Sequence, residues 1–173
     1  MLSSYIINNS PFKINKNLKV KFVQLYRTED SWLKTGINLY SERLNKYISF
    51  ENKELDVPGA KGKSKEQGQL AEAEKVLSQI KSADYVVLLD EKGKSFTSEE
   101  FAFWMNKKFT SISGDLIFVV GGAYGFHESL RQRSKESIAL SSMTFTHQMV
   151  RVIFVEQLYR AMTILKNEPY HHS

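Results

Sequence analysis

The sequence DLIFVVGGAYGF, at residues 115–126, runs five consecutive apolar residues directly into three closely spaced glycines. A continuously apolar run is typical of a strand covered on both faces, as in a parallel sheet with helices on each side. Open α/β sheets bind ligands at the C-terminal ends of such strands, and glycines let the backbone approach a ligand closely. The stretch therefore predicts a buried parallel strand followed by a turn that either binds a ligand or simply leads into a helix.

Strand and helix patterns alternate along the rest of the chain. Apolar runs or alternating apolar residues predict strands at 18–26, 50–57, 85–90, 116–120 and 137–143. Helical spacing of apolar residues predicts helices at 30–48, 65–80, after the Thr97–Glu100 capping box, at about 127–135 and at about 146–166. The alternation predicts the α/β class, with a mainly parallel sheet and helices on both faces.

The glycines do not match the common phosphate-binding fingerprints. A dinucleotide-binding turn needs a glycine two residues before Gly122, where Val120 stands. The sequence Gly-Lys-Ser occurs at 62–64 and at 93–95, but each copy lacks the earlier glycine of a phosphate loop, so both are interpreted as basic solvated turns. A ligand of this turn is therefore expected to need close backbone contact rather than a phosphate-binding lysine.

Length and composition limit the possibilities further. The 173 residues, 42% of them hydrophobic, fit one domain with a substantial core, which we assign to residues 18–173. Residues 1–17 are rich in Ser and Asn and are expected to be a disordered arm or a non-native extension. The net charge of +5 suits a polyanionic partner, and the absence of cysteine fits a reducing compartment. Apolar runs are too short to span a bilayer, so we expect a soluble protein.

A second motif, SSMTFTHQMVRVIFVEQLYRA, occupies residues 141–161. His147 and Arg151 are four residues apart, so on a helix both would point to the same side of its exposed first turn. They suit proton transfer or phosphate binding, but a capping or core histidine and a surface ion pair are equally simple interpretations. Apolar residues surround much of the predicted helix, which indicates burial in the core or against a second subunit. Glu156 and Arg160 are expected to form an intrahelical pair.

Four segments together resemble a known family in order and spacing. They are LLDEKGK at 88–94, FVVGGAYGF at 118–126, LSSMTFTHQMVRVIFVEQLYRA at 140–161 and the terminal EPYHH. The chain resembles the RlmH family of SPOUT methyltransferases over roughly residues 18–172. That family methylates N3 of a pseudouridine in the 23S RNA of the large ribosomal subunit. The resemblance implies a C-terminal trefoil knot, although folded chains rarely knot.

The resemblance also implies a site, a cofactor and partners. S-adenosylmethionine would bind to Leu89, Asp90, Gly121, Gly122, Gly125, Ser141, Ser142, Met143, Thr144, Phe145 and Thr146. The implied catalytic residues are His147, Arg151, Tyr170 and His171, with His147 the first candidate for the base and His171 the second. The implied setting is a cytoplasmic homodimer acting on 23S rRNA within the ribosome, without a metal or a membrane. One subunit's tail could complete the partner's site.

Two alternatives from other classes remain at this point. The first is a noncatalytic RNA-binding module with the same knotted fold. The second is a small flavodoxin-type nucleotide-binding protein, which is disfavoured because the short, charged segment YRTED at 26–30 follows the first strand in place of a phosphate loop. Binding of S-adenosylmethionine separates these readings from the methyltransferase.

Overall fold

The computed structural model describes residues 18–58 and 63–170. The arm expected at residues 1–17 and the candidate base His171 lie outside these ranges. A five-stranded sheet in the order β2-β1-β4-β3-β5 forms the centre of the molecule, and every neighbouring pair is parallel. Its strands are β1 (Lys19–Leu25), β2 (Ser49–Leu55), β3 (Tyr85–Ser95), β4 (Leu116–Val120) and β5 (Glu136–Ala139). The predicted α/β class and parallel sheet are confirmed.

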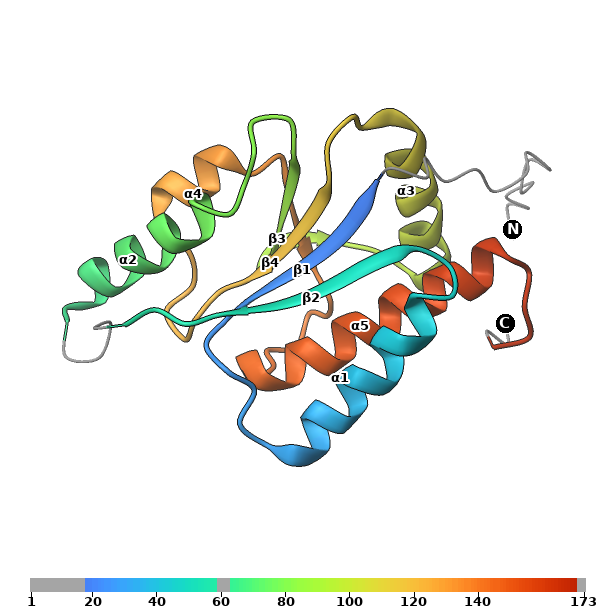
Figure 1. Cartoon of the computed structure of the whole chain (residues 1–173), viewed down its shortest axis with the longest axis horizontal. Helices are drawn as coiled ribbons and strands as arrows, with labels where there is room; N and C mark the ends of the chain where they lie inside the picture. Colours follow the sequence, from blue (N-terminus) through green and yellow to red (C-terminus); the bar gives the residue numbers. More distant parts are fainter. Residues whose placement is uncertain (1–17, 59–62, 171–173) are drawn as a thin grey trace.

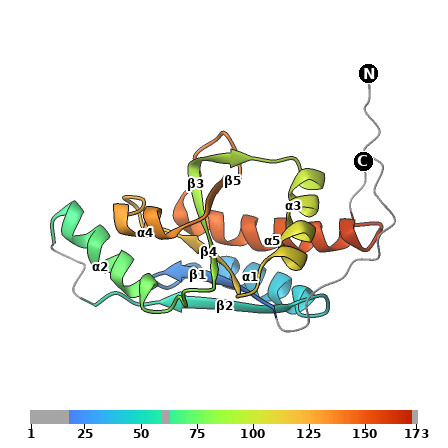
Figure 2. The ribbon, with the colours of Figure 1, turned by 90° about the horizontal axis from the view of Figure 1, so that it is seen from above.

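Helices cover both faces of this sheet. They are α1 (Ser31–Leu44), α2 (Lys65–Leu77), α3 (Ser98–Ser111), α4 (Glu128–Arg133) and α5 (His147–Leu165). One core cluster joins the sheet to α1, α3 and α5, and a second joins it to α2 and α4. Figure 1 shows α2 beside α4 and α1 beside α5, on opposite sides of the strands. In Figure 2, α3 lies next to the later turns of α5.

The central strand β4 contains the apolar run of residues 116–120. All five of its residues are buried. Leu116, Phe118 and Val120 belong to the core cluster on the α5 side, while Ile117 and Val119 belong to the cluster on the α2 side. Because successive side chains of a strand point to opposite faces, a strand covered on both faces must be apolar at every position.

Two strand boundaries differ from the sequence prediction. β3 runs to Ser95 instead of ending near residue 90, since after a register shift Lys94 pairs with Ile138 and Ser95 with Ala139. Gly93 permits this close pairing, because a Cβ there would lie 2.5 Å from the backbone of Ile138. The interpretation of residues 93–95 as a turn is therefore wrong. β5 stops at Ala139 instead of residue 143, and residues 140–146 form a loop.

The length and apolar character of the helices decide whether any of them could cross a membrane. Across residues 18–58 and 63–170, none of the helices combines the length and the apolar character that crossing a bilayer requires.

Candidate cofactor and catalytic site

The three predicted cofactor-binding segments lie at the same edge of the sheet, the one formed by the C-terminal ends of its strands. Leu89 of β3 pairs in register with Val120 of β4 and with Ile138 of β5. Because the three strands are parallel, Asp90, which follows the last β3 residue paired with β4, lies on the same side as the turn at 121–125 after β4 and the loop at 140–146 after β5. The Thr144 hydroxyl lies 3.2 Å from Glu91 Oε2, to which it donates a hydrogen bond, and so ties the last loop to the first segment. The structure thus brings these segments together.

The glycine turn, residues 121–125, is a tight reversal of the chain. The Gly125 amide donates to the Gly122 carbonyl at 3.2 Å, and Gly125 has a φ of +76°, a conformation that L side chains rarely adopt. A Cβ at Gly121 would lie 3.1 Å from the ring of Phe126, whereas a Cβ at Gly125 would meet no atom within 4 Å. The turn is therefore packed from behind at Gly121 and open at Gly125, as a backbone surface for a ligand must be.

Asp90 is held in place by α4, the helix that follows the turn. Its carboxylate pairs with Arg131 of α4 at 2.7 Å and accepts a hydrogen bond from the Lys92 amide at 3.0 Å. The guanidinium of Arg131 lies over the Phe126 ring, 5.7 Å from its centroid. Leu89 is buried in the core. Leu89 and Asp90 therefore offer a ligand mainly their backbone groups. Their side chains fix this part of β3.

Exposed apolar side chains surround this edge. Tyr124 is 66% exposed, Met143 71% and Phe145 36%, and the Ser141 hydroxyl accepts from the Met143 amide at 2.9 Å to shape the loop. Adenine and a sulfonium group are suited to apolar side chains and backbone hydrogen bonds, and they need no phosphate-binding lysine. The residues present therefore fit S-adenosylmethionine.

His147 is the first residue of α5 and lies next to this loop. Thr146 precedes it as the N-cap, and the Thr146 hydroxyl accepts from the Met149 amide at 3.3 Å. Burial, followed by the positive charge of Arg151, lowers the pKa of His147 below its ordinary value of 6.5. The imidazole is therefore neutral at neutral pH and able to accept a proton.

Arg151 corrects the expectation that two exposed groups share the start of the helix. Its side chain is completely buried, and its guanidinium donates to the Leu25 carbonyl at 2.7 Å and to the Thr28 hydroxyl at 2.9 Å. Thr28 in turn donates to Glu54 Oε1 at 2.8 Å. The burial has a physical cause: the start of α5 packs against the segment that follows β1, where Gln148 donates to the Arg27 carbonyl and Arg151 meets Leu25 and Thr28. Arg151 fixes the segment that follows β1.

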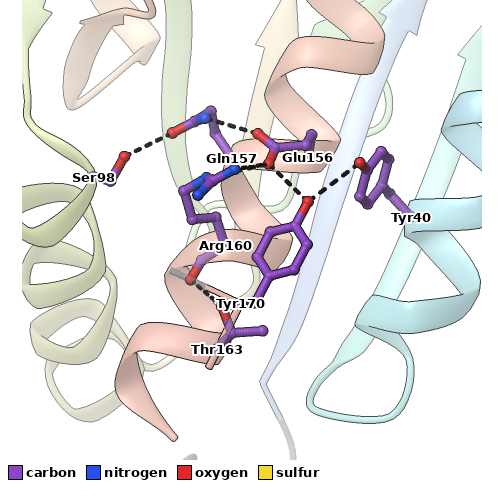
Figure 3. A network of polar contacts seen from close by, with 7 residues as sticks. All are labelled: Tyr40, Ser98, Glu156, Gln157, Arg160, Thr163 and Tyr170. Atoms are coloured by element: carbon purple, nitrogen blue, oxygen red, sulfur yellow. Dashed lines mark hydrogen bonds and ion pairs between the residues drawn. The ribbon is translucent and has the colours of Figure 1, made fainter. Parts of the chain in front are cut away.

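Tyr170 follows the end of α5 and folds back against Glu156 and Arg160 of that helix, as Figure 3 shows. Its hydroxyl donates to Glu156 Oε1 at 3.1 Å and lies 3.3 Å from the Tyr40 hydroxyl of α1. The predicted pair of Glu156 and Arg160 is confirmed at 2.7 Å, and Arg160 also lies over the Tyr170 ring at 4.9 Å. Burial and the Tyr40 hydroxyl raise the pKa of Tyr170.

Part of α5 separates the two groups of predicted site residues. The Tyr170 hydroxyl reaches Glu156 at the middle of the helix, nine residues after His147, which at a rise of about 1.5 Å per residue is roughly 14 Å along the helix axis. Within one subunit, the structure therefore does not bring Tyr170 to the edge where His147 and the glycine turn lie.

Two residues that no sequence pattern marks lie against the glycine turn. The Tyr26 hydroxyl donates to Glu72 Oε1 at 2.8 Å, and the Glu72 carboxylate also accepts from the Gly122 amide. Glu72 belongs to a charged helix in which several acidic residues look equivalent, so only the three-dimensional contact distinguishes it. Among the described residues, no group of three or more His, Asp or Glu side chains could hold a metal ion.

Comparison with known proteins finds a matching family and several relatives. The family model described as predicted SPOUT methyltransferase matches residues 18–171. Ribosomal RNA large subunit methyltransferase H of Parabacteroides distasonis is 46% identical over 156 residues, covering 90% of this chain and 99% of the relative. The protein of the same name from Christiangramia forsetii is 47% identical, with the same coverage.

A solved structure supports the fold independently. The crystal structure of tRNA (m1G37) methyltransferase from Aquifex aeolicus superposes with a TM-score of 0.53 at 14% identity, covering 90% of this chain and 75% of that one. At this identity the similarity concerns the fold alone. On the family match and the close relatives, the chain belongs to the SPOUT methyltransferase family, and within it to the RlmH group, ribosomal RNA large subunit methyltransferase H.

Proposed function

We propose that this chain transfers a methyl group from S-adenosylmethionine to N3 of a pseudouridine in 23S rRNA of the large ribosomal subunit. One observation carries the proposal: three strand-end segments that fit the cofactor meet at one sheet edge, beside a histidine whose pKa lies below its ordinary value. The names of the relatives, which are methyltransferases of large-subunit ribosomal RNA, support the substrate.

SPOUT methyltransferases use S-adenosylmethionine, which supplies an activated methyl group. The proposed cofactor-binding residues belong to β3 or follow β4 and β5 at the common edge, namely Leu89, Asp90, Gly121, Gly122, Gly125 and residues 141–146. Their task is to hold the reacting groups in line, since alignment is a large part of catalysis in a transfer between two bound molecules. The Asp90–Arg131 pair contributes by fixing β3 at the point where its pairing with β4 ends.

His147 is proposed as the general base. N3 of a pseudouridine carries an imide proton, which must leave before the nitrogen can attack. A neutral imidazole accepts this proton, and the neighbouring Arg151 charge helps to keep it neutral. His171 is the second candidate for the base.

Arg151 has a supporting role in this proposal. Because its guanidinium is buried and bonded to Leu25 and Thr28, it does not offer its donors to an RNA phosphate at the surface. Its positive charge acts instead through His147. It also holds the segment after β1 against the start of α5.

The assembly is proposed to be a homodimer in which the tail of one subunit completes the site of the other. Seven apolar residues of α5 are only half-buried in the single subunit: Met149, Val150, Val152, Ile153, Tyr159, Ile164 and Leu165. A second subunit covering them would remove this surface from water. Tyr170, remote from His147 in its own subunit, could then stack on an RNA base in the partner's site. So small a protein has little surface for reading RNA sequence, and we propose that the assembled ribosome in the cytoplasm supplies specificity by its shape.

Transfer of labelled methyl groups tests this function. Ribosomes lacking the modification are incubated with the protein and labelled S-adenosylmethionine, in parallel with ribosomes whose target uridine was never isomerised. Label is expected at one position of 23S rRNA, and only when pseudouridine is present. Absence of label with a correctly folded protein would contradict the proposal and would favour a noncatalytic RNA-binding module.

A further inference from the structure

Glu72 of α2 connects the end of β1 to the glycine turn. One of its carboxylate oxygens accepts from the Tyr26 hydroxyl at 2.8 Å, and the carboxylate also accepts from the Gly122 amide. Tyr26, Glu72 and Gly122 come from three segments far apart in the sequence. The contact therefore depends on the completed fold, and its acceptor is a half-buried carboxylate.

The fit between Glu72 and the turn is close. A Cβ added to Gly122 would lie 2.6 Å from Glu72 Oε1, which is closer than side chains approach one another. Glycine at this position therefore leaves the space that the carboxylate needs to reach the backbone. Burial raises the pKa of Glu72 above its ordinary value of 4.5, although the hydrogen bonds from Tyr26 and Gly122, which favour the ionised form, act in the opposite direction.

The backbone of Tyr26 is also unusual. It has a φ of +66°, a conformation uncommon for residues other than glycine, and its amide donates to the Leu55 carbonyl at 2.8 Å. Surrounding contacts must stabilise a conformation of this kind, and in proteins such residues occur often at functional sites. Here the residue in this conformation donates a hydrogen bond from its phenol hydroxyl to the Glu72 carboxylate.

The same helix makes a second contact with the turn. Gln69, three residues before Glu72 and on the same side of α2, donates from Nε2 to the Tyr124 carbonyl at 2.6 Å. Side chains of α2 therefore bind an amide on one arm of the turn and a carbonyl on the other. This leaves the turn little freedom to change shape while α2 stays in place.

We propose that Glu72 is a positioning residue whose carboxylate, held by Tyr26, fixes the 121–125 turn in the shape that binds S-adenosylmethionine. The inference rests on the proposed function, because it assigns that turn to the cofactor. Glu72 acts through the backbone of Gly122. The expected consequence of losing it is weaker cofactor binding, while the chemical step of bound complexes is retained.

The Glu72→Gln variant tests this with little change of shape. A side-chain amide is neutral and has one acceptor oxygen where the carboxylate has two, so the hydrogen bonds from the Gly122 amide and the Tyr26 hydroxyl lose their charge assistance. Isothermal titration calorimetry of the full chain should show S-adenosylmethionine bound about tenfold more weakly, as expected for one lost charge-assisted hydrogen bond. Glu74→Gln is the matched control: it removes the same charge from an exposed position of the same helix and should change the Kd by less than about twofold.

Kinetics distinguishes positioning from general stability. In Glu72→Gln the KM for S-adenosylmethionine should rise about tenfold, while kcat at saturating cofactor and the KM for ribosomes stay within about twofold. Tyr26→Phe removes one donor to the carboxylate and should weaken cofactor binding by a smaller factor in the same direction. It is the deciding variant if Glu72→Gln does not fold.

The outcomes separate this inference from the proposed function. If the unaltered chain binds S-adenosylmethionine and Glu72→Gln binds it equally well, Glu72 does not position the turn, although the proposed function stands. An unchanged Kd in folded Tyr26→Phe, with Glu72→Gln unfolded, has the same meaning. If the unaltered chain binds no S-adenosylmethionine, both proposals are overturned.

Discussion

At the scale of single residues, burial decides what the two prominent polar groups at the start of α5 can do. His147 stays half-buried beside the loop at 141–146, whereas Arg151 is fully enclosed. Although the two residues are one helical turn apart, His147 is able to contact a substrate, whereas Arg151 acts only through its neighbours. Two predictions follow from this difference.

The first prediction concerns His147→Gln, which removes the proposed base and retains a polar side chain. The variant should lose about 10²–10⁴ in kcat, the range typical of general base catalysis, while the Kd for S-adenosylmethionine remains unchanged. In the unaltered protein, kcat/KM should fall on the acid side with a midpoint below 6.5, because the base works only when neutral and its pKa is lowered. Full methyl transfer by the variant at neutral pH would contradict the assignment.

The second prediction concerns the effect of Arg151 on His147. In Arg151→Met, the pKa of His147 should move up toward 6.5, because a neighbouring positive charge that disfavours the imidazolium has been removed. Titration of the His147 ring protons by NMR measures this change. Arg27→Met, at an exposed position outside the core, is the control and should leave the pKa of His147 in place. An equal effect of both variants would show that Arg151 has no special influence.

At the scale of elements, the edge strand β5 is held by one acidic side chain. The Glu136 carboxylate accepts hydrogen bonds from Tyr85 of β3 and from Lys108 and Trp104 of α3, the last at 2.9 Å. Burial would raise the pKa of Glu136, but these three donors outweigh it, and the pKa lies below the ordinary value of 4.5. β5 leads directly into the loop at 140–146, so its attachment also supports the candidate site.

The third prediction is that Glu136→Gln lowers the free energy of unfolding at pH 7 by about 1–3 kcal/mol, since Lys108 keeps a partly buried charge without its anion. Glu136 is ionised more readily in the folded state, so its contribution is complete above pH 4.5 and is lost as the pH falls through its lowered folded-state pKa. Urea unfolding from pH 7 to pH 3 should show the two proteins converging. Glu51→Gln, exposed on the opposite edge strand β2, should change stability by less than about 0.5 kcal/mol.

Elements were predictable from sequence where local patterns determine them. The apolar run of β4 and the capping box of α3 were identified correctly, because continuous burial and capping are visible in the chain itself. The end of β5 was wrong, since it is set by the neighbour: pairing with β3 stops at Ser95 and Ala139. Contacts between distant segments carry no local signature. Arg151 is bound by partners that lie 123 and 126 residues away in the sequence, and Glu72 is hydrogen-bonded to Tyr26, which lies 46 residues away.

At the scale of the whole molecule, the position of the predicted site residues is best understood with two copies of the chain. The resemblance placed His147 and Tyr170 in one site, and the structure places the Tyr170 hydroxyl at Glu156, nine residues along α5 from His147. The trefoil knot stays a prediction of that resemblance. The parallel sheet and the meeting of three strand ends are features of a single subunit, whereas the complete site is proposed to need a second.

The fourth prediction tests the dimer. The unaltered protein should sediment at micromolar concentration as a species of twice the chain mass of 20.0 kDa. Ile153→Asp should convert it to a monomer, because a charge would be placed on a half-buried apolar position of α5. Leu70→Asp is the control, since Leu70 is partly exposed on α2, on the other face of the sheet. A monomeric unaltered protein would contradict the proposed assembly.

The strand order has a consequence for how the chain reaches its native state. β1 lies between β2 and β4, and its contact with the segment before β4 joins Lys19 to Asp115 across 96 residues. Contacts so distant in sequence slow folding, because a long loop must close before any stabilisation is gained. During translation, β1 is synthesised early, whereas its neighbour β4 is synthesised only after most of the chain. Its apolar residues Val20 and Phe22 stay without their final neighbours during that interval, when a newly made chain is most prone to aggregate.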